Sequence, residues 1–244
     1  LWFILLLVAG FVAILMYRNW RNKQHAMALE QTVLERTQQL EKLNEGLDWM
    51  ANHDNLTRLS NRHHVQQTLN QMSQSEDTLP LGVINIDLDY FKKVNDQYGH
   101  DFGDQVLKTF SQMLKKAADR RFTVSRWGGE EFIILCSNTA LPELQLLADQ
   151  IIKKCRTLRI KAKNDKVIML SCSVGFVHLP HFNPEQDKVT QMEKTIQLAD
   201  KALYAAKDNG RDQWFGYVIK QNSHNIKFHD FFNDTQSDIS HYRI

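Results

Sequence analysis

The chain begins with an unbroken apolar run that gives way abruptly to charged sequence. Residues 1–17 carry no charged side chain, and Arg18, Arg21 and Lys23 follow at once. A run of this length lies at the lower limit of about 17 residues for a helix that spans a bilayer. Since Lys and Arg favour the cytoplasmic side, we expect the C-terminal part of a truncated transmembrane helix here, followed by cytoplasmic sequence. A signal peptide is the alternative, but its positive charges would precede the apolar run.

Apolar residues then recur at alternating steps of three and four, as in a heptad repeat. The repeat consists of Ala26, Leu29, Val33, Leu40, Leu43, Leu47 and Met50, interrupted once by Arg36. The pattern predicts a parallel coiled coil in a linker at residues 18–50, and therefore a homodimer. A single amphipathic helix packed on the next domain would have the same spacing. A coiled coil directly after a membrane helix would set the spacing and rotation of two cytoplasmic domains.

Beyond residue 50 the pattern alternates between helical and strand periods. It predicts helices near 61–74, 102–118, 141–158 and 191–208, strands at 81–88, 166–177 and 212–218, and a hairpin at 122–136. Helices interleaved with an antiparallel hairpin indicate an α+β domain at residues 51–219, a sandwich in which helices flank one mixed sheet. Residues 220–244 are polar, and we expect a mobile or loosely docked C-terminal tail without a function of its own.

Composition narrows the classes of function. The 244 residues carry a net charge of only +2, which argues against an electrostatic nucleic-acid binder, so we expect no nucleic-acid partner. Cys136, Cys155 and Cys172 have no paired or metal-ligand spacing, which is typical of reduced core thiols in a cytoplasmic domain.

Two glycines and two carboxylates occupy the tip of the predicted hairpin, in the run Gly128-Gly129-Glu130-Glu131. Glycine pairs supply the positive φ angles that tight hairpin turns require. Taken alone, this run is more typical of a solvated turn than of a functional site.

A second acidic site ends the predicted strand at 81–88. Strand alternation places Asn85, Asp87 and Asp89 on one face, so two carboxylates could lie together. Oxygen ligands of this kind suit Mg²⁺ or Mn²⁺. A metal ion held by Asp87 and a hairpin glutamate would form a phosphoryl-transfer centre, whereas a simple polar end to the strand would bind nothing. Strand geometry alone does not distinguish Asp87 from Asp89.

Two further polar segments allow either a structural or a binding role. Asp101 would cap the following helix and Asp104 would then occupy its third position, where acids favour the helix dipole. Alternatively, Asn95 and Asp104 would present an amide and a carboxylate to a purine edge. At the end of the last helix, Lys207 and Arg211 would interact with the helix dipole or clamp a triphosphate.

Four motifs follow one another between residues 48 and 218. They are Asp54-Asn-Leu56-Thr57-Arg-Leu59-Ser-Asn61-Arg62, Asp87-Leu-Asp89-Tyr-Phe91-Lys92-x-x-Asn95-Asp96-x-x-Gly99-His100-x-x-Gly103-Asp104, Arg126-Trp-Gly128-Gly129-Glu130-Glu131-Phe132 and Tyr204-x-Ala206-Lys207-x-x-Gly210-Arg211. This ordered set resembles the GGDEF-domain diguanylate cyclases, here with the variant sequence GGEEF. The resemblance implies the palm-like nucleotide-cyclase form of the α+β sandwich.

The resemblance also implies a reaction and a location. Two GTP molecules, each bound to one subunit of a homodimer, would condense into cyclic di-GMP with release of two pyrophosphates. The 3′-hydroxyl of each GTP would attack the α-phosphorus of the other. The protein would lie in the bacterial inner membrane, with its catalytic domain in the cytoplasm.

By motif position, Asp87, the Leu88 carbonyl and Glu130 would hold Mg²⁺ or Mn²⁺. Glu130 would also be the general base, and Glu131 would assist with a second ion. Lys92 would stabilise charge in the transition state. The choice of Asp87 as the ligand comes from the family pattern.

The same pattern assigns the residues that bind substrate. Asn95, His100 and Asp104 would hold the guanine and ribose end of GTP, while Lys207 and Arg211 would grip its terminal phosphates.

One departure from the family concerns product inhibition. Active members often carry an Arg-x-x-Asp inhibitory site, but Asp119 stands at the arginine position and Phe122 at the aspartate position. We therefore expect loss of feedback through this site. Arg120 and Arg121 lie close by, but side-chain direction changes with each residue of a strand, which argues against their substituting.

Two other classes of function remain open. A catalytically silent module would bind GTP or a partner protein without turnover, although such relatives typically lose the hairpin acids, and Glu130 and Glu131 are both present. An adenylyl cyclase or similar nucleotidyl enzyme would have a base site that cannot pair with guanine, which Asn95 and Asp104 argue against.

Overall fold

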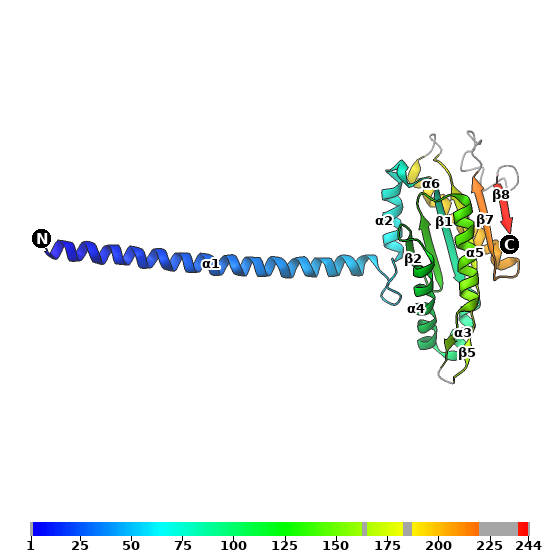
Figure 1. Ribbon diagram of the computed structural model, residues 1–244, viewed down its shortest axis with the longest axis horizontal. Helices are drawn as coiled ribbons and strands as arrows, with labels where there is room; N and C mark the ends of the chain where they lie inside the picture. Colours follow the sequence, from blue (N-terminus) through cyan, green and yellow to red (C-terminus); the bar gives the residue numbers. More distant parts are fainter. Residues whose placement is uncertain (1, 163–164, 183–186, 220–238, 244) are drawn as a thin grey trace. The chain divides into compact units, whose positions relative to one another are not determined.

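The computed structural model describes residues 2–162, 165–182, 187–219 and 239–243, in two units at residues 1–50 and 51–244. The first unit belongs to one continuous helix, α1 (Trp2–Asn52), coloured blue in Figure 1. Its most apolar window has a mean hydropathy of 1.8, long and apolar enough to cross a membrane by length and composition alone. The predicted apolar run and linker therefore form one helix without a break.

The second unit is an α+β sandwich, as the sequence predicts. Its elements are α2 (Arg62–Ser73), η1 (Glu76–Thr78), β1 (Leu81–Leu88), α3 (Phe91–Tyr98), α4 (His100–Ala117), β2 (Thr123–Gly128), β3 (Glu131–Cys136), α5 (Leu141–Thr157), β4 (Ile160–Lys161), β5 (Val167–Ile168), β6 (Cys172–Leu179), α6 (Lys188–Asp208), β7 (Trp214–Ile219) and β8 (Ile239–Arg243). Six strands form one sheet in the order β2-β3-β1-β6-β7-β8. The sheet is mixed, because β6 and β7 are parallel while the other neighbours are antiparallel.

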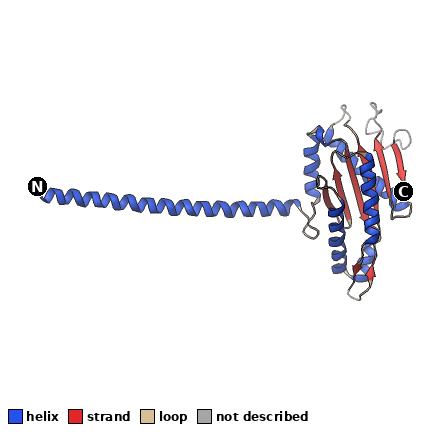
Figure 2. Ribbon diagram, in the orientation of Figure 1, coloured by secondary structure: helices blue, strands red, loops and turns tan. Residues whose placement is uncertain are grey.

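Helices cover both faces of this sheet (Figure 2). Ile84, Ile86 and Leu88 point to the face packed by α4 and α5, and Val83 points to the face packed by α2 and α6. This alternation along β1 confirms the strand prediction and buries both faces of its central strand. The polar residues of β1, Asn85 and Asp87, have the same parity as Val83 and therefore lie on the α6 face.

Three predictions about local structure are wrong. No helix was predicted between residues 88 and 102, but the structure has α3 there. Phe91 and Val94 recur at helical spacing and are buried despite the polar residues between them. Helix α4 starts at His100 with Gly99 at its N-cap, so Asp101 does not cap it and Asp104 is not its third residue. The strand predicted at 166–177 is divided, because β5 pairs with β4 in a separate two-stranded sheet and only β6 joins the main one.

The predicted C-terminal tail falls mostly outside the described residues, which omit 220–238 and 244. Within that tail, residues 239–243 form β8 and pair with β7.

Candidate functional site

The hairpin β2–β3 brings its two glutamates beside the end of β1. Gly128 pairs with Glu131 across a two-residue turn, whose first residue, Gly129, has a φ of 52° that L-residues with side chains rarely adopt. Glu131 also pairs with Asp87 across β1 and β3. The backbone N–H of Leu88 donates to the Glu130 carbonyl at 3.4 Å. The predicted hairpin acids and the predicted strand acid therefore meet at one edge of the sheet.

Asp87 is the centre of this acidic group. It is buried, and its Oδ2 lies 2.8 Å from the Nζ of Lys207 at the end of α6. Burial raises the pKa of the Asp87 carboxyl above its ordinary value, Lys207 opposes the rise, and the charges of Glu130 and Glu131 add to it. One ammonium faces three carboxylates, so the local charge favours an additional cation.

The residues present fit a divalent ion held by oxygen ligands. Asp87 and Glu130 supply carboxylates, and Leu88, which follows Asp87 and donates its N–H to the Glu130 carbonyl, supplies a backbone carbonyl. Hard oxygen donors of this kind are typical of Mg²⁺ and Mn²⁺ sites. No cluster of three or more His, Cys, Asp or Glu side chains with metal-binding geometry occurs among the described residues. A metal ion here would therefore depend on that carbonyl, on water and on substrate phosphates as well as on carboxylates.

Asp89 has a structural role, because its carboxylate is fully hydrogen-bonded. Its carboxylate accepts hydrogen bonds from the hydroxyls of Ser171 and Ser173, both at 2.7 Å, and from the backbone N–H of Asp212 at 3.1 Å. These contacts join the end of β1 to the start of β6 and to the segment before β7. With its oxygens satisfied and only 5% of its surface exposed, Asp89 holds the edge of the sheet together.

Arg126 connects the hairpin to the start of the second unit. Its Nε donates to the Gly129 carbonyl at 2.9 Å, and its Nη1 lies 3.2 Å from both carboxylate oxygens of Asp54. Asp54 also accepts from the N–H and hydroxyl of Thr57. Burial opposes ionisation of Asp54, yet the bonds from Thr57 and Arg126 hold its pKa below the ordinary value. The turn that carries Glu130 is thereby fixed to residues 54–57.

The predicted base-binding residues lie on α3 and α4. Asn95 packs against Gly103, where an added Cβ would come within 1.9 Å of the Asn95 Oδ1, so only glycine leaves room for this side chain. Asp104 follows on the exposed surface of α4, and His100 is exposed in its first turn. Lys92 is exposed on α3. Among the described residues, no hydrogen bond or ion pair joins these four side chains to the Asp87 group.

Arg211 contacts the segment between β1 and α3 through an aromatic ring. Its Cζ is 4.9 Å from the ring centroid of Tyr90, which directly precedes α3, and Lys93 Nζ is 4.5 Å from the same ring. Together with Lys207, these side chains supply positive charge beside the acidic group, as binding of a polyphosphate requires. The sequence had not indicated Tyr90, whose only signal is its place between Asp89 and Phe91.

Asp119 and Phe122, which stand where the family's inhibitory site has Arg and Asp, make other contacts. Asp119 accepts from the backbone N–H of Arg121 at 2.9 Å, and Phe122 is partly buried against the core. Arg121 itself donates to Glu143 at 2.6 Å and to the Asn138 carbonyl at 3.1 Å.

Comparison with known proteins gives a consistent result. Residues 51–213 match the family model described as diguanylate cyclase, GGDEF domain. The chain is 35% identical over 179 residues to the cyclic di-GMP phosphodiesterase PdeR of Escherichia coli K12, covering 73% of this chain and 26% of that protein. It is 36% identical over 162 residues to the diguanylate cyclase DosC of the same organism, covering 66% of this chain and 34% of DosC.

Solved structures agree in fold. The diguanylate cyclase SiaD of Pseudomonas aeruginosa, solved with its activator SiaC, superposes with a TM-score of 0.62 at 28% identity, covering 88% of this chain and 82% of SiaD. The coiled coil and GGDEF domain of DgcB from Caulobacter crescentus, solved with c-di-GMP, gives a TM-score of 0.63 at 25% identity, covering 75% and 96%.

Proposed function

Because the chain belongs to the GGDEF family of diguanylate cyclases, we propose that its second unit condenses two GTP molecules into cyclic di-GMP and two pyrophosphates. The observation that carries this proposal is the meeting of Glu130 and Glu131 with Asp87 beside a single paired lysine. Such a group binds a cation and, through it, phosphate. Family membership alone does not show that the chain is a cyclase. One similar protein is named as a phosphodiesterase, and the chain matches only 26% of its length.

Asp87, the Leu88 carbonyl and Glu130 would hold Mg²⁺ or Mn²⁺, which supplies charge neutralisation at the phosphates. Glu130 accepts the proton of the attacking 3′-hydroxyl. Glu131, exposed at the start of β3, would assist with a second ion. Lys92, exposed on α3, balances the negative charge that develops at the reacting phosphorus.

Asn95, His100 and Asp104 hold the guanine and ribose of GTP. The Asp104 carboxylate accepts from the adjacent N–H groups of guanine, a pairing that adenine does not offer. Lys207 and Arg211 bind the terminal phosphates. Lys207 pairs with Asp87 in the structure, and its ammonium group would be available to the substrate once a metal ion at Asp87 supplied the balancing charge.

Product inhibition through the family's Arg-x-x-Asp site is absent. Two observations support this part of the proposal. Asp119 and Phe122 stand where the site requires Arg and Asp, and the neighbouring Arg121 is already bonded to Glu143 and to the Asn138 carbonyl. Adding cyclic di-GMP at the start of the reaction leaves the initial rate unchanged, and a rate that falls with added product would contradict this part of the proposal.

The protein acts as a membrane-anchored homodimer at the bacterial inner membrane, with the second unit in the cytoplasm. Support comes from the apolar start of α1, from Arg18 and Arg21 after it, and from the heptad positions that follow. A dimer is needed because each copy binds one of the two GTP molecules. The sequence GGEEF retains both acids that turnover requires.

The proposal is tested by the rate of pyrophosphate release from GTP and Mg²⁺, with Glu130→Gln as the critical variant. Loss of the ligand and base lowers the rate by at least about 100-fold. Glu193→Gln, which removes an exposed acid from α6 outside the site, is the matched control and retains the wild-type rate. Full activity in Glu130→Gln would refute the assignment, and wild-type protein that binds GTP without releasing pyrophosphate would establish a silent module.

A further inference from the structure

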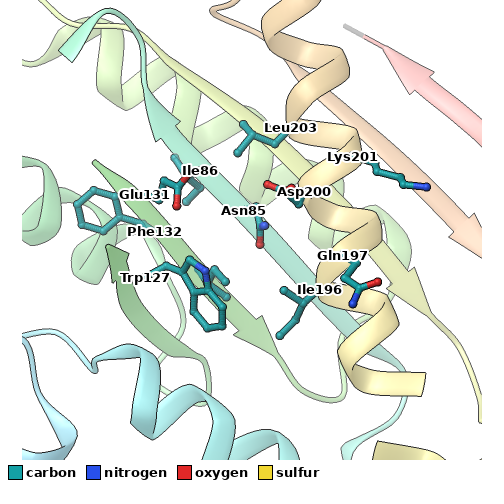
Figure 3. Close-up of a pocket in the computed structure, with 11 residues that line it drawn as sticks. Asn85, Ile86, Trp127, Glu131, Phe132, Ile196, Gln197, Asp200, Lys201 and Leu203 are labelled. Atoms are coloured by element: carbon teal, nitrogen blue, oxygen red, sulfur yellow. The ribbon is translucent and has the colours of Figure 1, made fainter. Parts of the chain in front are cut away.

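A cavity of about 530 Å³ lies on the α6 face of the sheet, between β1, the hairpin and α6 (Figure 3). Asn85 forms its floor, Trp127 and Glu131 border it from the hairpin, and Asp200 borders it from α6. Of the residues assigned to the reaction, only Glu131 lines it. Its volume falls in the range that small-molecule sites occupy.

Asn85 gives the cavity an unsatisfied polar group. The residue is 7% exposed, and its Oδ1 is buried without a hydrogen-bond donor among the described residues. A buried amide oxygen normally has a partner, because leaving one unpaired is unfavourable. Figure 3 shows the Asn85 amide directed into the hollow between the hairpin and α6. A ligand with an N–H donor would satisfy it.

The charge around the cavity favours a cation. The carboxylates of Glu131 and Asp200 both lie at the hollow in Figure 3, whereas the Lys201 ammonium points away from it. Within the described part of the chain, neither carboxylate forms an ion pair. Acceptors therefore converge from β1, β3 and α6, and an anion would be repelled.

Trp127 adds an aromatic wall. Its indole is in cation–π contact with the Arg62 guanidinium, whose Cζ lies 4.6 Å from the ring centroid. Ile196 supplies an apolar surface on α6. Two carboxylates on opposite sides of the hollow, an amide oxygen and an aromatic wall match a planar group with several N–H donors.

We propose that this cavity binds a small organic cation that carries an amidinium or guanidinium group on a flat apolar body. The N–H groups donate to Asp200, Glu131 and the Asn85 Oδ1, and the flat body packs against Trp127. Binding requires no turnover, so its outcome is independent of the proposed cyclase activity.

The test uses the full chain in detergent micelles, with benzamidine as the probe and uncharged benzamide as its isostere, and measures binding by saturation-transfer NMR without GTP. Benzamidine binds with a dissociation constant on the order of 1 mM, and benzamide does not bind. Asp200→Asn weakens benzamidine binding about ten-fold, because one charge-assisted pair is lost. Glu193→Gln, an acid of the same helix outside the cavity, leaves the affinity unchanged.

Two further variants separate this site from its neighbours. Asp87→Asn retains benzamidine binding, since Asp87 does not line the cavity. Asn85→Leu weakens binding while the far-UV circular dichroism stays native; if this central-strand variant does not fold, Asp200→Asn carries the test. Equal binding of benzamide, an unchanged affinity in Asp200→Asn, or a loss of affinity in Asp87→Asn or Glu193→Gln would overturn the proposal.

Discussion

At the scale of single residues, Asp87 and Asp89 have opposite environments although they lie on one face of the same strand end. Asp89 accepts three hydrogen bonds that hold β1, β6 and the segment before β7 together, whereas Asp87 faces a lysine and two further acids. Strand alternation predicts that both side chains lie on one face, and Asp89 does bind Ser173, which pairs with Asp87 across β1 and β6. It cannot predict which of them is satisfied, because the serines that bind Asp89 lie more than 80 positions away in sequence.

This difference predicts contrasting variants. Asp89→Asn replaces an acceptor-only carboxylate with an amide and lowers the free energy of unfolding by about 1 to 3 kcal/mol. Asp87→Asn changes that free energy by less than about 0.5 kcal/mol, since the buried charge is itself unfavourable and an amide oxygen can still accept from Lys207. Urea denaturation without metal measures both. Equal destabilisation by the two changes would show that Asp89 has no special structural role.

His178 provides a pH prediction. It is buried on β6, with Nε2 3.1 Å from the Thr139 carbonyl, and burial lowers its pKa below the ordinary 6.5. Below pH 6.5 the unfolded chain therefore binds more protons than the folded one, so the stability that neutral His178 contributes above this pH is lost as the pH falls through the folded pKa.

His178→Gln accordingly makes the unfolding free energy less dependent on pH between neutrality and mild acid. Thermal unfolding across that range measures the slope. A slope unaltered by His178→Gln would contradict this account.

At the scale of elements, the hairpin is positioned by contacts that no local pattern reveals. Its strands, its glycine turn and the place of its acids follow from sequence periodicity and turn chemistry. The attachment of the hairpin to residues 54–57 does not follow from such local patterns, because Arg126 and Asp54 are 72 positions apart. Arg126 is the one charged residue of β2, and this was the available signal, since a partly buried charge needs a partner. Helix α3 was missed for a different reason: its polar residues are typical of turns, and only Phe91 and Val94 mark its buried side.

Arg126→Met tests the attachment. It leaves the half-buried Asp54 carboxylate without its cation and the Gly129 carbonyl without its donor, so the free energy of unfolding falls by about 2 kcal/mol. The cyclase rate falls further than stability explains, because the Glu130 turn loses its support. Arg120→Met, at an exposed arginine nearby, serves as the control. Denaturation and activity are measured in parallel on the same preparations. Wild-type activity in folded Arg126→Met would contradict this role of Arg126.

At the scale of the whole molecule, the heptad positions of α1 bear on assembly. Leu29, Val33, Leu40, Leu43, Leu47 and Met50 are each more than half exposed in the single chain. A stripe of this kind is buried when two such helices form a coiled coil. The repeat follows from the sequence pattern, and the exposed stripe is the face that a second helix would cover.

Arg36 interrupts this stripe, so we expect Arg36→Leu to strengthen the proposed dimer. Replacing a charge in the seam with an apolar residue lowers the dimer dissociation constant by at least about ten-fold, because the new side chain is buried on association. Gln38→Leu adds the same side chain outside the seam and leaves the constant unchanged. Analytical ultracentrifugation in detergent compares them. An equal effect of both changes would indicate nonspecific association instead of a heptad seam.

The central claim, that this chain joins two GTP molecules through the acidic group at Asp87 and Glu130, is tested most directly by the mass of the product. The full chain in detergent is incubated with GTP and Mg²⁺ at high protein concentration, and the nucleotide products are identified by mass spectrometry. The account predicts cyclic di-GMP, with two pyrophosphates released for each molecule formed and none from Glu130→Gln. A cyclic mononucleotide, or GTP recovered intact from folded protein, would contradict it.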